Sequence, residues 1–136
     1  MGIRRNPAPP EIGVVDLDTA KRIKRGELRD MRDAVIKEGF SYGGRTYPID
    51  PDIQLSMMIQ FQTSQVMPAP SYSWKDVDGI YREIGDADAF RAFVTAALLY
   101  GQSQYAREEM LQGLVESKTT VEDVLAVTWM TVPPGG

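Results

Sequence analysis

The sequence predicts an α+β fold that is mostly helical, with three main helices, a short C-terminal helix and two short β-hairpins. Apolar residues recur at helical spacing along three long segments, and an aspartate suited to capping stands before each. Two aromatic segments with central glycines separate these helices, at about residues 40–47 and 72–84. Aromatic runs around such glycines are typical of hairpins.

The first helix is predicted to begin near Asp16, Asp18 or Thr19 and to run to about Glu38. Gly39 follows as the left-handed residue that ends it. Charged residues surround a narrow apolar stripe, so we expect this helix to bury one seam only. The stripe comprises Ala20, Leu28, Met31 and Val35, with Ile23 beside it.

The first hairpin follows directly. Phe40–Tyr42 and Arg45–Tyr47 supply the strands, and Gly43-Gly44 permits the positive φ angles of a tight turn. Asp50 and Pro51 then suit the cap and the first position of the second helix. That helix runs to about Val66 and is apolar on more than one side, so we expect it to be the central and most buried one.

The second hairpin is predicted around a two-residue Asp78-Gly79 turn. Its strands carry Tyr72, Trp74 and Asp76 before the turn, and Tyr81 and Glu83 after it.

A long third helix should begin at Asp86 or Asp88 and end near Glu116 or Ser117. Gly101 within it costs about 1 kcal/mol relative to alanine, which indicates either a close helix crossing or a bend. The short last helix should be capped by Thr119, three residues before Glu122, and end near Trp129.

Three regions follow from this plan. Residues 1–15 are proline-rich and form an extended arm, residues 16–130 form a single domain, and residues 131–136 form a C-terminal tail. The N-terminus lacks the apolar run of a signal peptide, and no apolar stretch reaches the ~20 residues of a membrane helix. We therefore expect a soluble protein made in a cytoplasm.

Composition argues against ordinary catalysis. The chain has no cysteine and no histidine, so disulfides, thiolate metal sites and the commonest general base are all excluded. Residues 1–45 carry +3 and residues 46–136 carry −7, within a net charge of −4. The acidic balance argues against nucleic-acid binding. The dipolar layout suits a subunit that meets other subunits, although solvated helix faces explain it equally well.

The aspartate pairs resemble acid–base or metal sites, but all three stand at helix starts, where capping is the default role. The acidic helix start after Gly43-Gly44 also excludes a phosphate loop. We expect no catalytic residue, no metal ligand and no cofactor, and hence no enzyme. The pairs are Asp16 with Asp18, Asp50 with Asp52, and Asp86 with Asp88.

The hairpin aromatics are expected mainly to form cross-strand pairs and to cover helices, with Trp74 fully buried. A protein interface or a glycan contact is the alternative reading. The candidate partner-binding residues are Arg4, Arg5, Pro7, Pro9 and Pro10 of the arm, and Tyr72, Trp74 and Tyr81 of the second hairpin.

Ordered motifs from Arg25 to Trp129 resemble an uncharacterised domain family of phages and prophages. The matching motifs are "GFSYGGRTYPID" after the charged first helix, "YSWKDVDGIYREIGDADAF" and the terminal "VEDVLAVTW". Genes of this family lie at or beside those of tail fibres and tail-fibre assembly factors. It has no established catalytic residues.

The resemblance implies a virion tail component that is made in the bacterial host cytoplasm and binds other tail subunits. It would sit in the baseplate, the tail tip or the fibre-attachment region, and we expect it to be a homo-oligomer with neither nucleic-acid nor membrane partners. Two alternatives stay open. One is a tail-fibre assembly chaperone that is absent from the mature particle, and the other is a receptor or glycan binder.

Overall fold

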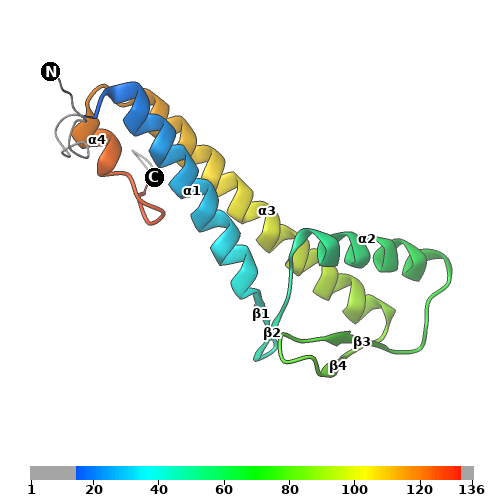
Figure 1. The fold of residues 1–136 in the computed structure, drawn as a ribbon. Coiled ribbons are helices and arrows are strands. Elements are labelled where there is room, and N and C mark those ends of the chain that lie inside the picture. Colours follow the sequence, from blue (N-terminus) through cyan, green and yellow to red (C-terminus); the bar gives the residue numbers. More distant parts are fainter. Residues whose placement is uncertain (1–14, 133–136) are drawn as a thin grey trace, which may run out of the picture. The chain divides into compact units, whose positions relative to one another are not determined.

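The computed structural model describes residues 15–132, which fall into two compact units (Figure 1). We call residues Arg32–Ala106 the hairpin unit, and residues 15–31 with 107–132 the helical unit. The elements confirm a mostly helical α+β fold with two antiparallel hairpins. In chain order they are α1 Leu17–Glu38, β1 Phe40–Tyr42, β2 Arg45–Tyr47, α2 Pro51–Val66, β3 Tyr72–Lys75, β4 Tyr81–Gly85, α3 Ala87–Ser117 and α4 Val121–Leu125.

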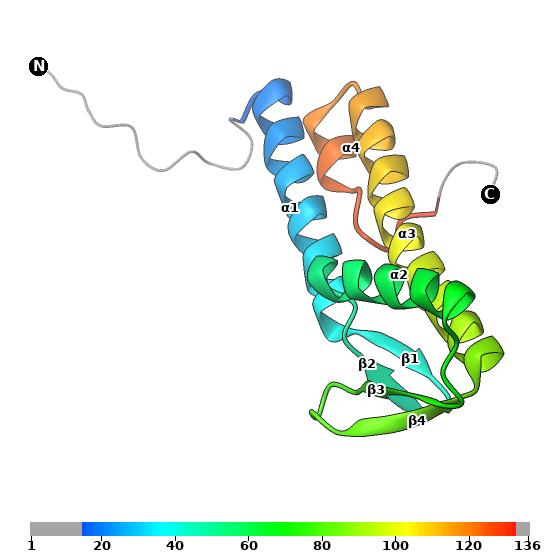
Figure 2. The ribbon, with the colours of Figure 1, turned by 90° about the vertical axis from the view of Figure 1, so that its right-hand side faces the viewer.

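The core of the hairpin unit is built on the first half of α3. Its buried side chains include Phe90, Phe93, Val94 and Ala97, none of which is exposed to solvent. This part of α3 lies between α2 and the two hairpins (Figures 1 and 2). The prediction that α2 is the central helix is therefore wrong. Only Met57 and Ser64 of α2 are buried, because just one of its apolar sides faces the rest of the unit.

Both hairpins hold the expected strands. Phe40 pairs with Tyr47 in the first, and Gly43 and Gly44 turn it with φ angles of 57° and 79°. The backbone N–H of Val77 donates to the carbonyl of Thr46 at 2.9 Å and so joins the two hairpins.

The second hairpin differs from the two-residue turn that the sequence predicts. A pair of backbone contacts closes it, since the Asp76 N–H donates to the Ile80 carbonyl at 2.9 Å and the Gly79 N–H donates to the Asp76 carbonyl at 3.0 Å. Three residues, with Gly79 at φ 80°, thus make the turn. The register shifts between Tyr72 and Ser73, because Tyr72 pairs with Gly85 and Ser73 with Glu83, so β4 has a bulge at Ile84.

The first aspartate of each pair caps a helix, as predicted. Carboxylate oxygens of Asp16, Asp50 and Asp86 accept from the backbone N–H three residues later, at 2.7, 3.1 and 2.9 Å. The hydrogen bond from the Thr19 backbone is the main reason why the pKa of Asp16 lies below its ordinary value. These three carboxylates thus accept hydrogen bonds from backbone N–H groups that would otherwise have no partner at the helix starts.

Gly101 marks a close approach, the first of the two explanations that its position suggested. The Gln54 side chain of α2 lies 3.1 Å from the point where a Cβ on Gly101 would stand. The same amide donates to the carbonyl of Ile49 at 2.7 Å. The absence of a side chain at Gly101 thus lets the Gln54 side chain pack against α3 while it donates to the backbone just before α2.

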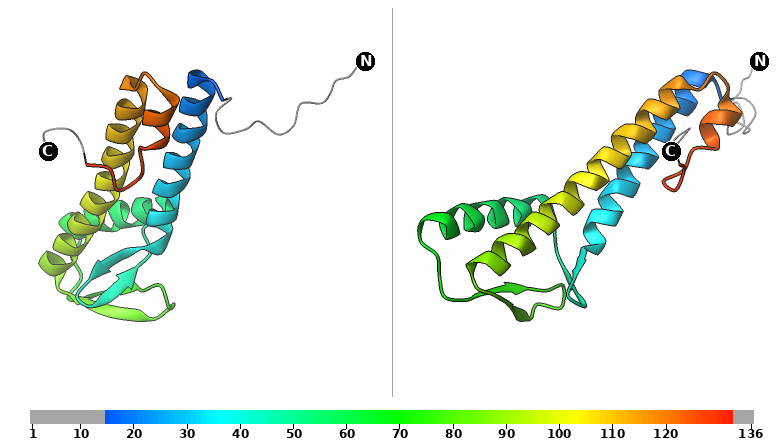
Figure 3. Two further views of the ribbon diagram at one scale, coloured as in Figure 1. Left: turned by 90° about the vertical axis from the view of Figure 1, so that its left-hand side faces the viewer. Right: turned by 180° about the vertical axis from the view of Figure 1, so that it is seen from behind.

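In the helical unit, α1 and α3 residues lie side by side (Figure 3). Arg25 pairs with Glu116 at 2.5 Å, and Lys21 donates to the Glu116 carbonyl at 2.8 Å. The predicted stripe of α1 is partly wrong, because Ile23 and Met31 are exposed.

Lys24 takes a place in that stripe and is buried. Its ammonium lies 3.1 Å from the Glu27 carboxylate and 3.5 Å from the Leu125 carbonyl at the end of α4. A lysine can occupy an apolar seam in this way because its long stem packs while its charged end finds partners.

The cap and the length of α4 differ from the prediction. Thr120, and not Thr119, accepts from the Asp123 backbone at 3.1 Å, and the helix ends at Leu125 rather than near Trp129. Trp129 is nevertheless buried, with the Arg107 guanidinium 5.9 Å from its ring centre.

The predicted arm lies, except for its last residue, outside the described residues, and the tail is described only at Thr131 and Val132. The single domain over 16–130 stays a prediction. Within residues 15–132, no helix is both long enough and apolar enough to cross a membrane.

Gly39 offers a direct test of the junction between α1 and β1. Its φ is 98°, and an added Cβ would stand 2.7 Å from the Tyr47 carbonyl oxygen. We expect Gly39→Ala to lower the free energy of unfolding by about 2–3 kcal/mol, from backbone strain and this clash.

Gly26→Ala in the same helix is the matched control, since nothing lies within 4 Å of its added Cβ. It should instead stabilise the protein by about 1 kcal/mol. Urea unfolding of both variants decides the matter, and equal effects would contradict the assigned role of Gly39.

Candidate binding surfaces

The aromatic residues predicted to bind partners divide between the core and the surface. The Tyr72 ring stacks on Phe90 with centroids 4.4 Å apart, and its hydroxyl accepts from the Ala69 N–H at 2.9 Å. Trp74 lies 5.8 Å from Phe90 and is half-buried rather than fully buried. Both rings brace α3, which confirms their expected covering role.

Tyr81 lies on the other face of the hairpin. It pairs with Lys75, whereas Trp74 pairs with Arg82, so Tyr81 and Trp74 alternate across the strands. Its ring is 68% exposed, and the Lys75 ammonium lies 5.3 Å from the ring centre. Of the three hairpin candidates, Tyr81 is therefore the most exposed to solvent.

A hollow of about 450 Å³ lies between this hairpin and α2. Aromatic and polar groups line it together, which is the usual makeup of a small-molecule or sugar contact. Its lining includes Trp74, Tyr81, Lys75, Gln60, Ser56 and Ser73.

Asp76 fixes the end of the hairpin beside this hollow. The buried carboxylate accepts from the Asp78 and Ile80 backbone at 2.9 and 3.0 Å, and from Arg82 Nε at 2.9 Å. The Arg82 hydrogen bond, followed by the one from Ile80, holds the pKa of Asp76 below its ordinary value. These contacts occupy the carboxylate, so it acts as a turn anchor.

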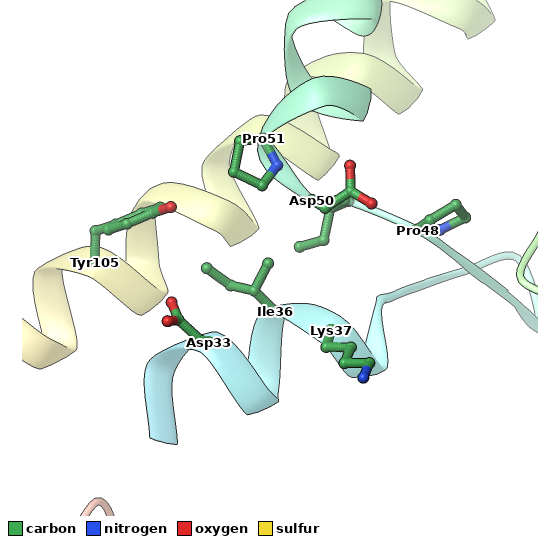
Figure 4. Close-up of a pocket in the computed structure, with 8 residues that line it drawn as sticks. Asp33, Ile36, Lys37, Pro48, Asp50, Pro51 and Tyr105 are labelled. Atoms are coloured by element: carbon green, nitrogen blue, oxygen red, sulfur yellow. The ribbon is translucent and has the colours of Figure 1, made fainter. Parts of the chain in front are cut away.

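A second hollow, of about 340 Å³, opens where α1, the start of α2 and Tyr105 come together (Figure 4). Ile36 lies at its centre, and the Asp33 and Asp50 carboxylates lie on opposite sides of Ile36. Asp33 already pairs with Arg32 at 2.7 Å, and Asp50 caps α2. The two acids do not converge, so the hollow offers no acid–base pair.

The outer side of α2 is the most unusual surface of the hairpin unit. Leu55, Ile59 and Val66 are 57%, 52% and 80% exposed. With Gln62 they are spaced 4, 3 and 4 residues apart, which places them on one helix face. No charged residue occurs from Ile53 to Trp74, nor from Ala92 to Ala106 of α3. We call these four residues, with Met58, Met67 and Leu99, the apolar face.

A groove continues this face between α2 and α3. It has a volume of about 320 Å³, and Met58, Phe61, Leu98 and Leu99 supply its apolar walls. Gln62, Gln65 and Thr95 supply its polar atoms, and no charged side chain lines it. The apolar residues that suggested a buried α2 thus lie partly on the surface. The long stretches without charged residues are the feature of the sequence that could have indicated this exposed surface.

The arm residues predicted to bind partners, Arg4, Arg5, Pro7, Pro9 and Pro10, lie outside the described residues. Between Val15 and Val132, no group of three or more carboxylate, histidine or cysteine side chains is placed to hold a metal ion.

Residues 19–128 match the model of a family described as a domain of unknown function (DUF4376). The chain belongs to the DUF4376 family. The match covers α1 from its third residue, both hairpins, α2 and α3, so it includes both hollows, the groove and the apolar face. Comparisons with curated proteins and with solved structures find no match.

The Asp76 contacts predict a dependence of stability on pH. Because the pKa of this carboxyl is lowered by folding, its contribution to stability is present above the unfolded value of about 4 and is lost as the pH falls through the folded value. Asp76→Asn should therefore be less stable than the wild type at pH 7, and the difference should shrink at pH about 2.5.

Urea unfolding at the two pH values measures this difference. Asp78→Asn, at the exposed neighbouring aspartate, is the control and should change little at either pH. A gap between Asp76→Asn and the wild type that is equally large at both pH values would contradict the anchoring role of the charge.

Proposed function

We propose that this chain is a non-enzymatic structural protein of a bacteriophage tail, which binds other tail subunits in the baseplate, tail tip or fibre-attachment region. The observation that carries a binding role is the apolar face, which exposes large side chains over adjacent helices with no charge among them. Exposed contiguous apolar surface of this kind is typical of protein interaction sites. The resemblance of the ordered motifs to phage and prophage proteins supports the tail context and, with it, location in the virion.

The non-enzymatic character rests on the chemistry of the chain. It has neither histidine nor cysteine, and the aspartates at the helix starts include three that accept backbone hydrogen bonds as caps. The hollow beside α1 holds acids on opposite sides (Figure 4). These features favour a protein that works through its surfaces.

An assembly chaperone would present the same kind of surface, since it binds an unfinished fibre and then leaves. Mass spectrometry of purified particles of the phage or induced prophage that encodes the chain separates the two roles. A structural subunit should appear at a fixed ratio to the major tail proteins. Absence from particles, together with presence in infected-cell lysates, would contradict the structural role and favour the chaperone.

The hollow beside Tyr81 favours one further candidate, a receptor contact through a sugar. An exposed ring with an adjacent lysine, an amide and hydroxyls can stack on and hydrogen-bond to a saccharide. On this reading Tyr81→Ala should slow adsorption to host cells about 2- to 10-fold, since a ring contact contributes about 0.5–1.5 kcal/mol.

The control for this experiment is Tyr105→Ala, which removes another partly exposed tyrosine of the hairpin unit away from the hollow. Particle yield and protein content should stay unchanged in both variants. Equal adsorption of wild type and Tyr81→Ala would eliminate the sugar contact, and so would an equal loss in both variants.

A further inference from the structure

We infer that the apolar face pairs with the same face of a second copy of this chain, with the two α2 helices packed antiparallel about a two-fold axis. The pairing rests on the proposed role of this face in contacts between subunits.

The pattern on α2 is that of a helix-pairing seam. Leu55, Ile59, Gln62 and Val66 follow the 4-3-4 spacing of alternating d and a positions in a heptad. This spacing lines the four side chains along one stripe of the helix, as knobs-into-holes packing between two helices requires. The side of α2 that faces the core is a different one, marked by Met57 and Ser64. Leu55, Ile59 and Val66 therefore lie away from the core of the hairpin unit and are at least half exposed.

The absence of charge favours a second copy over an unrelated protein. In a two-fold interface the same patch occurs on both sides, so each charge near the axis would meet its own copy. The seam is flanked by Ser56, Met58, Thr63 and Gln65, all uncharged. Gln62 within it suits self-pairing, because an amide both donates and accepts hydrogen bonds. A seam built for a different partner would more often carry charges that select that partner.

The size of the face also fits a dimer. Its six apolar side chains, each roughly half exposed or more, present on the order of 600 Å², against about 800 Å² per partner in a standard interface. They are Leu55, Met58, Ile59, Val66, Met67 and Leu99. Two such faces would together bury on the order of 1,200 Å², at the lower end of the range for specific interfaces.

The one acidic residue in line with the seam sets the orientation. Asp52 lies seven residues before Ile59 and is exposed. Parallel helices would bring two Asp52 carboxylates together, whereas antiparallel helices place them at opposite ends of the contact. The antiparallel arrangement also opposes the two helix dipoles.

Analytical ultracentrifugation of the full chain over about 1–100 μM tests the pairing, a range that brackets ordinary reversible dimers. The wild type should be a dimer. Ile59→Glu should raise the dissociation constant at least about 100-fold, because each dimer would bury two unpaired carboxylates. Val77→Glu is the matched control, since Val77 is 50% exposed but lies in the turn of the second hairpin. It should dimerise as the wild type does, and circular dichroism should show both variants folded.

Cysteine crosslinking tests the orientation, and the absence of native cysteine makes it specific. Gln62→Cys, near the middle of the seam, should give a covalent dimer with a short bismaleimide. Asp52→Cys should not, because antiparallel packing about the seam centre separates the two copies by about 25 Å at 1.5 Å per residue. Efficient crosslinking of Asp52→Cys would overturn the antiparallel pairing.

A wild type that is monomeric throughout the range, or an Ile59→Glu chain that dimerises normally, would overturn the pairing as a whole. Either result leaves the tail role to be judged separately by the content of purified particles. A monomeric chain found in particles at a fixed ratio would mean that another tail protein covers the face. A dimer absent from particles would contradict the structural role and leave the pairing intact.

Discussion

The hairpin unit depends on the position of Phe93 in α3. Its ring meets Tyr42 and Tyr47 of the first hairpin edge-on, with centroids 5.1 and 4.9 Å away, and it lies 6.4 Å from Trp74 of the second. Two hairpins of three to five residues per strand are too small to be stable alone. They are stable because α3 gives both of them one shared apolar surface. This arrangement makes α3, which follows both hairpins in the chain, the element on which they fold.

Placing α3 at the centre leaves α2 with a second apolar side. α2 has no strong amphipathic pattern, since apolar residues occur around most of its circumference. The hairpin unit covers the side with Met57 and Ser64 and partly covers Ile53 and Phe61, whereas Leu55, Ile59 and Val66 are at least half exposed. A helix of this composition normally has partners on more than one side. The same property therefore explains why the sequence suggests burial and why the structure exposes leucine, isoleucine and valine.

Local signals predicted most of the fold, and long-range packing decided the rest. Asp50-Pro51 and Gly43-Gly44 specify a helix start and a turn through their own backbone chemistry, and both occur as expected. The place of α2 depends on what α3 buries, which no local pattern contains. Lys24 enters an apolar seam because carbonyl and carboxylate groups from other turns reach its ammonium. At the candidate surface, the pairing of Trp74 with Arg82 and of Lys75 with Tyr81 places the two rings on opposite faces, and this register cannot be predicted from spacing alone.

The distribution of charge along the chain agrees with the exposure of α2. Residues 46–136 carry a net −7, yet the acidic residues among them stand mainly at helix starts, in the second hairpin turn and in the last turns of α3. At those places backbone N–H groups or basic side chains engage several of them, as with Asp50, Asp76 and Glu116. From Ile53 to Val66 of α2 and from Ala92 to Ala106 of α3, by contrast, the chain has no charged residue. An acidic protein whose α2 seam carries no charge avoids repulsion where two copies would meet, while its charged remainder keeps other surfaces apart. The charge pattern and the exposed seam therefore favour the same surface for association.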